Sequence, residues 1–265
     1  MIVSITDPAD PRVEAYRQVR ERDLVGRQGL FIAEGEVVVR SLVSSALMRT
    51  RSLLVAAHRL SSIEEILRRL PDEVPVFAVS QPVLDAIAGF PLHRGLMAVG
   101  QRIAAPQARA LIDSAPDAAL IVVLLGVGNH DNMGGVFRNA AAFGAHAVLI
   151  DPTSCDPLYR KAIRVSVGAA LRVPYARWSP GEDPLQLLDT AGFEVLSLSP
   201  TGGETLSRLV PPSKAAILLG SEGPGLPTAV LEQTRRISIP MSAGFDSLNL
   251  ATTAGIVLHH LTQGR

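Results

Sequence analysis

A short apolar run at residues 215–219 stops at Gly220 and is followed by a glycine-rich segment. A wholly apolar run of this length is typical of a strand that is buried on both faces of a parallel sheet. The segment after it, Gly-Ser-Glu-Gly-Pro-Gly-Leu at 220–226, predicts a tight loop, because it can continue neither a strand nor a helix. The run therefore predicts an α/β fold with a loop at the carboxyl end of a buried strand.

A second short strand is expected at residues 237–239, and it leads through Pro240 into a small, polar stretch. A helix rich in alanine and threonine opens at 248–250. Ligands collect at the carboxyl ends of strands in open α/β sheets. The two loops therefore predict a ligand site that carries three polar side chains, those of Glu222, Ser247 and Asn249.

A third strand is expected at residues 119–125, followed by a loop and then a helix at 136–143. The loop begins Gly-Val-Gly but lacks the third glycine of a dinucleotide-binding motif, which disfavours a nucleotide-dependent oxidoreductase. Asn132 stands where a helix N-cap is expected, so capping and a role in the site are both open for it. Arg138 lies on a stripe of glycine and alanine, where a long cation can meet a substrate, although an ordinary surface position is the alternative.

The rest of the chain predicts a second, smaller α/β domain before this one. Between residues 29 and 101, short apolar runs alternate with helical patterns. Residues 1–27 carry alternating charges and predict a solvated helix. The expected organisation is a first domain with an N-terminal arm at 1–103, a linker at 104–118 and a second domain at 119–265.

The chain has 25 basic and 25 acidic residues, so it is not a general polycation, but a local basic patch can still bind nucleic acid. Two such patches are candidates, and an ordinary solvated surface is the alternative for both. The first belongs to the N-terminal arm, and the second lies in a stretch from 157 to 177 that has no acidic residue. Their basic residues are Arg20, Arg22 and Arg27, and Arg160, Lys161 and Arg164.

A single cysteine, Cys155, excludes an internal disulfide framework and indicates a reducing compartment. No run approaches the ~18 apolar residues of a membrane span, and no signal pattern opens the chain. We therefore expect a cytoplasmic protein. No cluster of residues has metal-ligand spacing, so no metal is expected. Cys155 is expected to be a packed small residue rather than a nucleophile.

Three motifs in the second domain together resemble the SpoU (TrmH) branch of the SPOUT RNA methyltransferases. They are Asn-Met-Gly-Gly-Val-Phe-Arg-Asn at 132–139, the glycine-rich segment at 220–226, and Ile-Pro-Met at 239–241 followed by Ser-Leu-Asn-Leu-Ala at 247–251. Residues 29–100 more loosely resemble the L30e-like substrate-binding domain of that family. The resemblance implies an L30e-like α/β domain followed by a SPOUT domain, in which helices cover both faces of a mostly parallel sheet and the C-terminus forms a trefoil knot.

The resemblance also implies an activity: 2′-O-methylation of a ribose in RNA by S-adenosylmethionine, carried out by a homodimer joined through the C-terminal domain. The implied cofactor-pocket residues are Gly220, Ile239, Met241 and Leu248. The implied catalytic-site residues are Asn132, Arg138, Glu222, Ser247 and Asn249.

Arg138 is the residue that the family assigns to activating the 2′-hydroxyl. A guanidinium stays protonated, however, so binding the neighbouring phosphate and stabilising the developing alkoxide is at least as plausible for Arg138. The extra N-terminal domain favours 23S ribosomal RNA over transfer RNA as the substrate. A non-catalytic RNA-binding protein that keeps the fold is the remaining alternative.

Overall fold

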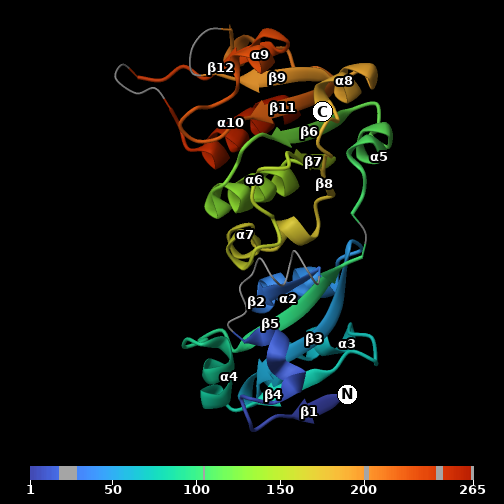
Figure 1. Ribbon diagram of the computed structural model, residues 1–265, viewed down its shortest axis with the longest axis vertical. Helices are drawn as coiled ribbons and strands as arrows, with labels where there is room; N and C mark the ends of the chain where they lie inside the picture. The colour runs from blue at the N-terminus through green and yellow to red at the C-terminus, as the bar shows by residue number, and fades with distance from the viewer. Residues whose placement is uncertain (18–28, 104, 200–202, 243–246, 264–265) are drawn as a thin grey trace. The chain divides into compact units, whose positions relative to one another are not determined.

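The computed structural model describes residues 1–17, 29–103, 105–199, 203–242 and 247–263. The contacts divide the chain into two compact units (Figure 1): Met1–Ala104 with Pro157–Arg172, and Ala105–Asp156 with Val173–Arg265. The expected boundaries differ from these in two places. The segment expected as a linker, 104–118, falls almost wholly in the second unit, and residues 157–172 pack with the first unit.

The first unit contains a five-stranded mixed sheet in the order β1-β4-β3-β5-β2. Its strands are β1 (Ile2–Ser4), β2 (Leu30–Glu34), β3 (Met48–Ala56), β4 (Val76–Val79) and β5 (Leu96–Arg102). β5 runs antiparallel to both of its neighbours, whereas β4 is parallel to β1 and β3. The helices of this unit are α2 (Glu36–Val43), α3 (Glu64–Arg68), α4 (Gln81–Ala88) and α7 (Arg160–Val165).

The solvated helix expected at the N-terminus is wrong for residues 1–17. This segment forms β1 and then a 3-10 helix at Pro11–Tyr16 whose Val13 and Tyr16 side chains are buried. The Tyr16 hydroxyl lies 2.7 Å from Ser52 Oγ inside the unit. The two apolar groups therefore hold the segment against the sheet, and the charge pattern alone did not reveal that. Residues 18–28 of the expected helix lie outside the described residues.

The second unit is built on a seven-stranded sheet in which every pair of neighbours is parallel, in the order β10-β12-β9-β11-β6-β7-β8. β11 lies between β6 and β9, and β12 lies between β9 and β10. The strands are β6 (Ala119–Leu124), β7 (Ala147–Ile150), β8 (Tyr175–Arg177), β9 (Glu194–Leu198), β10 (Glu204–Thr205), β11 (Lys214–Leu219) and β12 (Arg235–Ser238).

Helices cover both faces of this sheet, as expected (Figure 1). One face carries α5 (Ala108–Asp113), α8 (Pro184–Thr190) and α9 (Thr228–Glu232), and the other carries α6 (His130–Ala142) and α10 (Leu250–Thr262). All six residues of β6 are buried because both faces are covered. This double burial explains why residues 119–125 and 215–219 show no apolar–polar alternation.

The two helices α6 and α10 pack against each other through small residues. A Cβ atom added to Gly135 would lie only 2.5 Å from the Ala251 Cβ, so only glycine permits this approach. One turn further along α6, Asn139 Nδ2 donates a 2.6 Å hydrogen bond to the Ala251 carbonyl oxygen. The contact fixes the start of α10 beside the middle of α6.

Candidate functional site

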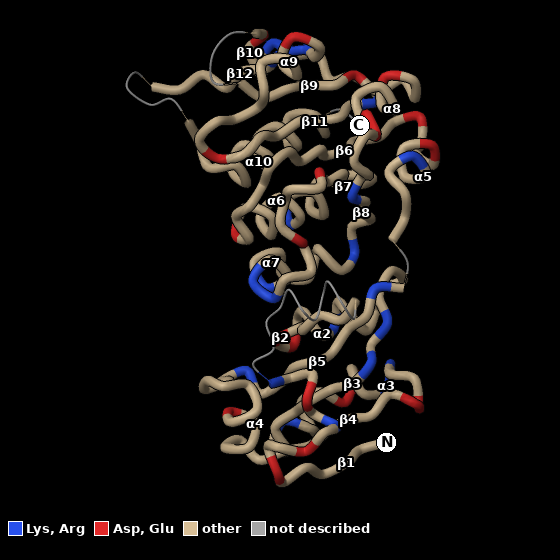
Figure 2. Tube along the Cα trace, in the orientation of Figure 1, with Lys and Arg blue, Asp and Glu red and all other residues tan. Residues whose placement is uncertain are grey.

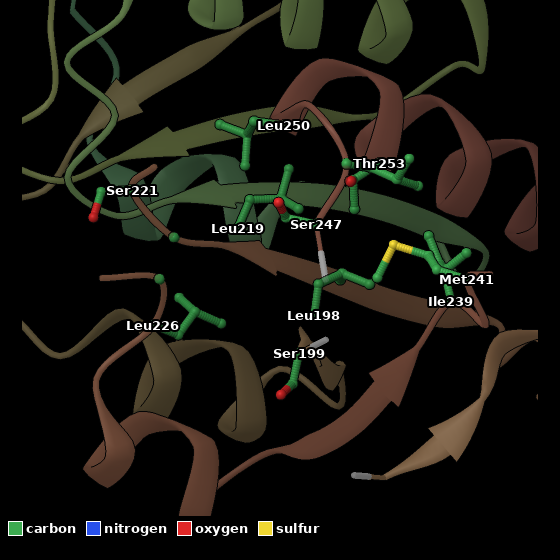
Figure 3. Close-up of a pocket in the computed structure, with 13 residues that line it drawn as sticks. Leu198, Ser199, Leu219, Ser221, Leu226, Ile239, Met241, Ser247, Leu250 and Thr253 are labelled. Carbon is green, nitrogen blue, oxygen red and sulfur yellow. The ribbon is translucent and has the colours of Figure 1, made fainter. Parts of the chain in front are cut away.

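An open pocket of about 150 Å³ lies where β9, β11 and β12 end (Figure 3). The lining residues come from the loops after these strands and from the first turns of α10. They are Leu198, Ser199, Leu219, Gly220, Ser221, Gly225, Leu226, Ile239, Met241, Ser247, Leu248, Leu250 and Thr253.

The four residues expected around a cofactor, Gly220, Ile239, Met241 and Leu248, all line this pocket. Ser247, expected among the catalytic residues, lines it as well. The predicted strand ends thus meet at one edge of the sheet. This is the arrangement that the parallel-sheet argument requires.

Residues at the end of β9 also line the pocket, and the sequence argument missed them. Leu198 is the last residue of β9, and Ser199 follows it. Nothing in the sequence indicated that the strand at 194–198 neighbours β11 rather than β8. Only the strand order assigns its carboxyl end to this site.

The lining combines apolar surfaces with hydroxyl groups. Leu198, Leu226 and Ile239 offer aliphatic walls, and Ser199 and Thr253 contribute hydroxyls (Figure 3). Such a lining suits a partly apolar ligand that also carries polar groups.

The glycine-rich loop folds back tightly on itself. A Cβ atom at Gly220 would lie 2.5 Å from the carbonyl carbon of Gly225, and the Gly225 N–H donates to the Ser221 carbonyl oxygen at 3.1 Å. Gly223 and Gly225 have φ values of +89° and +69°, a region that favours glycine. The tight loop expected at 220–226 is therefore confirmed, and its geometry requires these glycines.

A chain of side-chain hydrogen bonds joins three of the expected site residues. Asn132 Nδ2 donates to Glu222 Oε1, and Asn249 Nδ2 donates to Asn132 Oδ1 at 2.7 Å. The Asn249 oxygen in turn accepts from the N–H groups of Ala251 and Thr252 at the start of α10, at 2.9 and 3.2 Å. Each amide thus donates at one end and accepts at the other, so the chain has one direction from α10 to the carboxylate.

The helix-cap alternative for Asn132 is wrong, because α6 begins earlier than expected and Asn129 caps it. The Asn129 side chain accepts from the N–H of Asp131 at 2.8 Å and from the N–H of Asn132 at 3.4 Å. Asn132 lies inside the first turn of the helix and is only 2% exposed. Its side chain is therefore available to link Glu222 with Asn249.

Arg138 belongs to neither the pocket lining nor the hydrogen-bonded chain. It lies on the exposed side of α6. Within the described part of the protein, its guanidinium forms no hydrogen bond or ion pair. The site residues on this chain are thus split between a pocket group, a bonded trio and one exposed cation.

The basic residues expected to face RNA have different surroundings. Arg20, Arg22 and Arg27 lie outside the described residues. Arg160 bonds Glu34 through Nε at 2.9 Å and Nη2 at 2.7 Å, and it stacks over the Phe90 ring at 4.6 Å. Its guanidinium is therefore already bound to Glu34 and Phe90 within the first unit. Lys161 and Arg164 are exposed on the basic helix α7 (Figure 2).

Asp151 fixes the loop that leads into α6. Its carboxylate accepts from the N–H groups of Ser154 at 2.9 Å and Gly126 at 3.1 Å, and the Ser154 hydroxyl accepts from the Val127 N–H at 2.8 Å. Burial, the largest single influence, raises the pKa of Asp151, but the hydrogen bonds from Ser154, Thr153 and Gly126 together outweigh it, and the net pKa is lowered.

Cys155 is half-buried, and burial, followed by the charge of Asp156, raises its pKa to about 11. The thiol is therefore protonated near neutral pH, which suits the packed role expected for it.

The described residues contain no group of three histidine, cysteine or acidic side chains placed to hold a metal ion. In the same residues, no helix has the length and apolar character needed to cross a membrane.

Comparison with known proteins gives one consistent family. The model of the SpoU rRNA Methylase family matches residues 119–259. An uncharacterized tRNA/rRNA methyltransferase of Mycobacterium bovis is 36% identical over 272 residues, which span 99% of this chain and 92% of the relative.

Solved structures share the fold along almost the whole chain. An AdoMet-bound rRNA methyltransferase from Sinorhizobium meliloti matches with a TM-score of 0.82 at 22% identity, covering 98% of this chain and 97% of that one. A structure described as an RNA 2′-O ribose methyltransferase matches with a TM-score of 0.79 at 24% identity, covering 98% of each chain. The fold of both units is thus similar to that of these solved chains.

Proposed function

This chain belongs to the SpoU rRNA methylase family of RNA methyltransferases, and from that premise we propose that it methylates the 2′-oxygen of a ribose in 23S ribosomal RNA. The methyl donor is S-adenosylmethionine. The observation that carries the proposal is the pocket at the ends of β9, β11 and β12, because the family motifs at Gly220, Ile239 and Leu248 all line it. The bonded trio of Glu222, Asn132 and Asn249 supports it, since it joins the remaining motifs.

The donor set of the pocket suits S-adenosylmethionine. The aliphatic side chains of Leu198, Leu226 and Ile239 would pack on an adenine ring, and backbone groups at Gly220 and Ile239 would bond its edge. When bound, the cofactor supplies a methyl group on a sulfonium, and its leaving group is neutral. The protein therefore needs no acid at the leaving group, and its main tasks are positioning and control of the 2′-hydroxyl proton.

Arg138 acts on the RNA rather than on the cofactor. Its exposed guanidinium has no partner among the described residues and can bind the phosphate beside the target ribose. The same positive charge stabilises the alkoxide that develops as the 2′-oxygen attacks the methyl group. Because arginine stays protonated, we assign the charge stabilisation to Arg138 and leave the proton to solvent.

The bonded trio positions the site without touching the transferred methyl group. Asn132 holds the Glu222 loop against α6, and Asn249 holds the start of α10 to the same point. Ser247 lies on the pocket wall two residues before Asn249.

We propose three further properties that the family resemblance implies. The protein acts as a homodimer joined through the second unit, with the site near the subunit interface. Its cytoplasmic location, which we also propose, rests instead on the single cysteine. The C-terminal segment forms a trefoil knot, and the first unit binds the RNA substrate.

The experiment is transfer of labelled methyl groups from S-adenosylmethionine to purified RNA from cells that lack the gene. Label in 23S ribosomal RNA is expected, in a nucleotide that resists alkaline hydrolysis because its 2′-oxygen is blocked. Label in transfer RNA alone would show that transfer RNA, not 23S ribosomal RNA, is the substrate. Transfer RNA is the second candidate because the similar mycobacterial protein is named a tRNA/rRNA methyltransferase. RNA binding without any label would favour the non-catalytic alternative.

A further inference from the structure

The first unit contains its own open groove, of about 720 Å³. It lies between the end of α2, the start of β3 and the segment that follows α3. Its apolar lining includes Val43 and Ile103, and its charged lining consists of Arg49, Arg51, Arg69 and Glu73. The groove is therefore lined by three positive charges and one negative charge.

Two of these arginines, Arg49 and Arg51, stand out because their charge is not neutralised. Both are exposed on β3, where they alternate with buried Thr50 and Ser52. In the described part of the chain, neither guanidinium makes a hydrogen bond or an ion pair. Arg69, by contrast, bonds Glu65 at 2.9 Å.

A β-bulge in β3 falls at Arg51. Thr50 is opposite Gly100 of β5 and Ser52 is opposite Val99, so Arg51 is the extra residue of β3. A bulge interrupts the ladder and redirects the inserted side chain, and such irregularities concentrate next to functional sites. The regular ladder between β3 and β5 is thus interrupted at Arg51, whose guanidinium has no partner among the described residues.

A third basic residue lies at the same corner of the sheet. Met48 at the start of β3 is opposite Arg102 at the end of β5. Figure 2 shows basic residues, in blue, along the start of β3 and at the end of β5. The net charge of the whole chain is zero, so this corner attracts anions locally rather than through the overall field.

We propose that this groove binds the phosphodiester backbone of the substrate RNA, with Arg49 and Arg51 each contacting a phosphate. The inference rests on the proposed function, which supplies the polyanion. Guanidinium groups bind phosphate oxygens through paired hydrogen bonds. The groove is open and partly apolar, so a ribose or base can pack on Val43 and Ile103 while the phosphates meet the arginines. An acidic protein segment is the competing occupant.

The test is the salt dependence of RNA binding by the full-length double variant R49Q/R51Q. Each lost phosphate contact lowers the slope of log Kd against log salt by about 1, so the double variant is expected to lose about 2. Its affinity for purified 23S ribosomal RNA falls on the order of tenfold or more at about 0.1 M salt, because released counterions drive this binding. The variant R68Q/R109Q is the matched control, since it removes the same charge from side chains that are 75% and 62% exposed outside the groove.

Two further readouts separate this inference from the proposed function. S-adenosylmethionine affinity and turnover at saturating RNA stay at wild-type values in R49Q/R51Q, whereas KM for RNA rises. Thermal melting checks that the double variant is folded. If its Kd and salt slope equal those of the wild type, the groove proposal is overturned, and binding of an acidic protein becomes the better explanation. If the wild type itself methylates no RNA, the proposed function fails.

Discussion

At the scale of single residues, two asparagines three positions apart at the start of α6 have separate tasks. Asn129 caps the helix, and Asn132 links Glu222 to Asn249. Asn129→Ala is expected to lower the free energy of unfolding by about 1 kcal/mol without a matching loss of turnover. Asn132→Ala is expected to lower methyl transfer on the order of 100-fold, because the Glu222 loop and α10 lose their common tether. Methyl-transfer assays and urea denaturation of both variants check this. Equal effects of the two substitutions on turnover would contradict the assignment of capping to Asn129 and of site positioning to Asn132.

A second residue, Asp151, links the stability of the second unit to pH. Its pKa is lowered on folding, so its contribution is fully present above the unfolded pKa of about 3.9 and is lost as pH falls through the folded value. Asp151→Asn is expected to cost about 1–3 kcal/mol at neutral pH, because an amide cannot accept all the N–H groups that face the carboxylate. Denaturation curves below pH ~4 should show the two proteins converging. A difference that does not change with pH would show that the charge of Asp151 is irrelevant.

At the scale of elements, the contact between α6 and α10 depends on one missing side chain. Gly135→Ala places a methyl group 2.5 Å from the Ala251 Cβ and is expected to cost about 1–3 kcal/mol by overpacking. The double variant G135A/A251G transfers the methyl group to the other helix and is expected to recover much of that loss. Thermal or urea unfolding of the two single variants and the double variant measures the coupling. Strictly additive effects would mean that the two helices do not meet at this point.

The end of α7 carries a strained residue. Gly168 N–H bonds the Ile163 carbonyl oxygen at 3.0 Å and Val167 N–H bonds that of Arg164 at 3.1 Å, which is the hydrogen-bond pattern of a Schellman motif. Val167 occupies its left-handed position with a φ of +54°, where a β-branched residue is disfavoured. Val167→Gly is therefore expected to raise the free energy of unfolding by up to about 1 kcal/mol, as relief of 1–2 kcal/mol is partly offset by chain entropy. Denaturant unfolding tests this, and a less stable variant would show that packing by Val167 outweighs its strain.

The sequence predicted elements best where both faces of a strand are buried. Residues 119–125 and 215–219 are apolar throughout, and both form central strands of the seven-stranded sheet. It failed where packing depends on a few side chains, as at Val13 and Tyr16 in the 3-10 helix. It also misplaced the start of α6, because the glycine pair at 134–135 suggested a loop. In the structure those glycines lie inside the helix, where Gly135 admits Ala251.

At the scale of the whole molecule, the site is assembled from segments far apart in the sequence. The Glu222–Asn132 and Asn132–Asn249 bonds join residues 90 and 117 positions apart. Family motifs identified these residues in advance, but their mutual contacts follow from the strand order, which no local pattern specifies. For the same reason, local sequence patterns predicted neither the role of Leu198 in the pocket nor the groove at Arg49 and Arg51, since both depend on which strands are neighbours.

The central claim is that this chain methylates a ribose 2′-oxygen in 23S ribosomal RNA and that Arg138 is required for it. The direct measurement maps 2′-O-methyl groups in cellular RNA after deletion of the gene and after complementation with the wild type or with Arg138→Ala. We expect one position of 23S ribosomal RNA to lose its methyl group on deletion, the wild-type gene to restore it, and Arg138→Ala to leave it unmethylated while the purified variant still binds S-adenosylmethionine. An unchanged 2′-O-methyl pattern in the deletion strain, or full restoration by Arg138→Ala, would contradict the account.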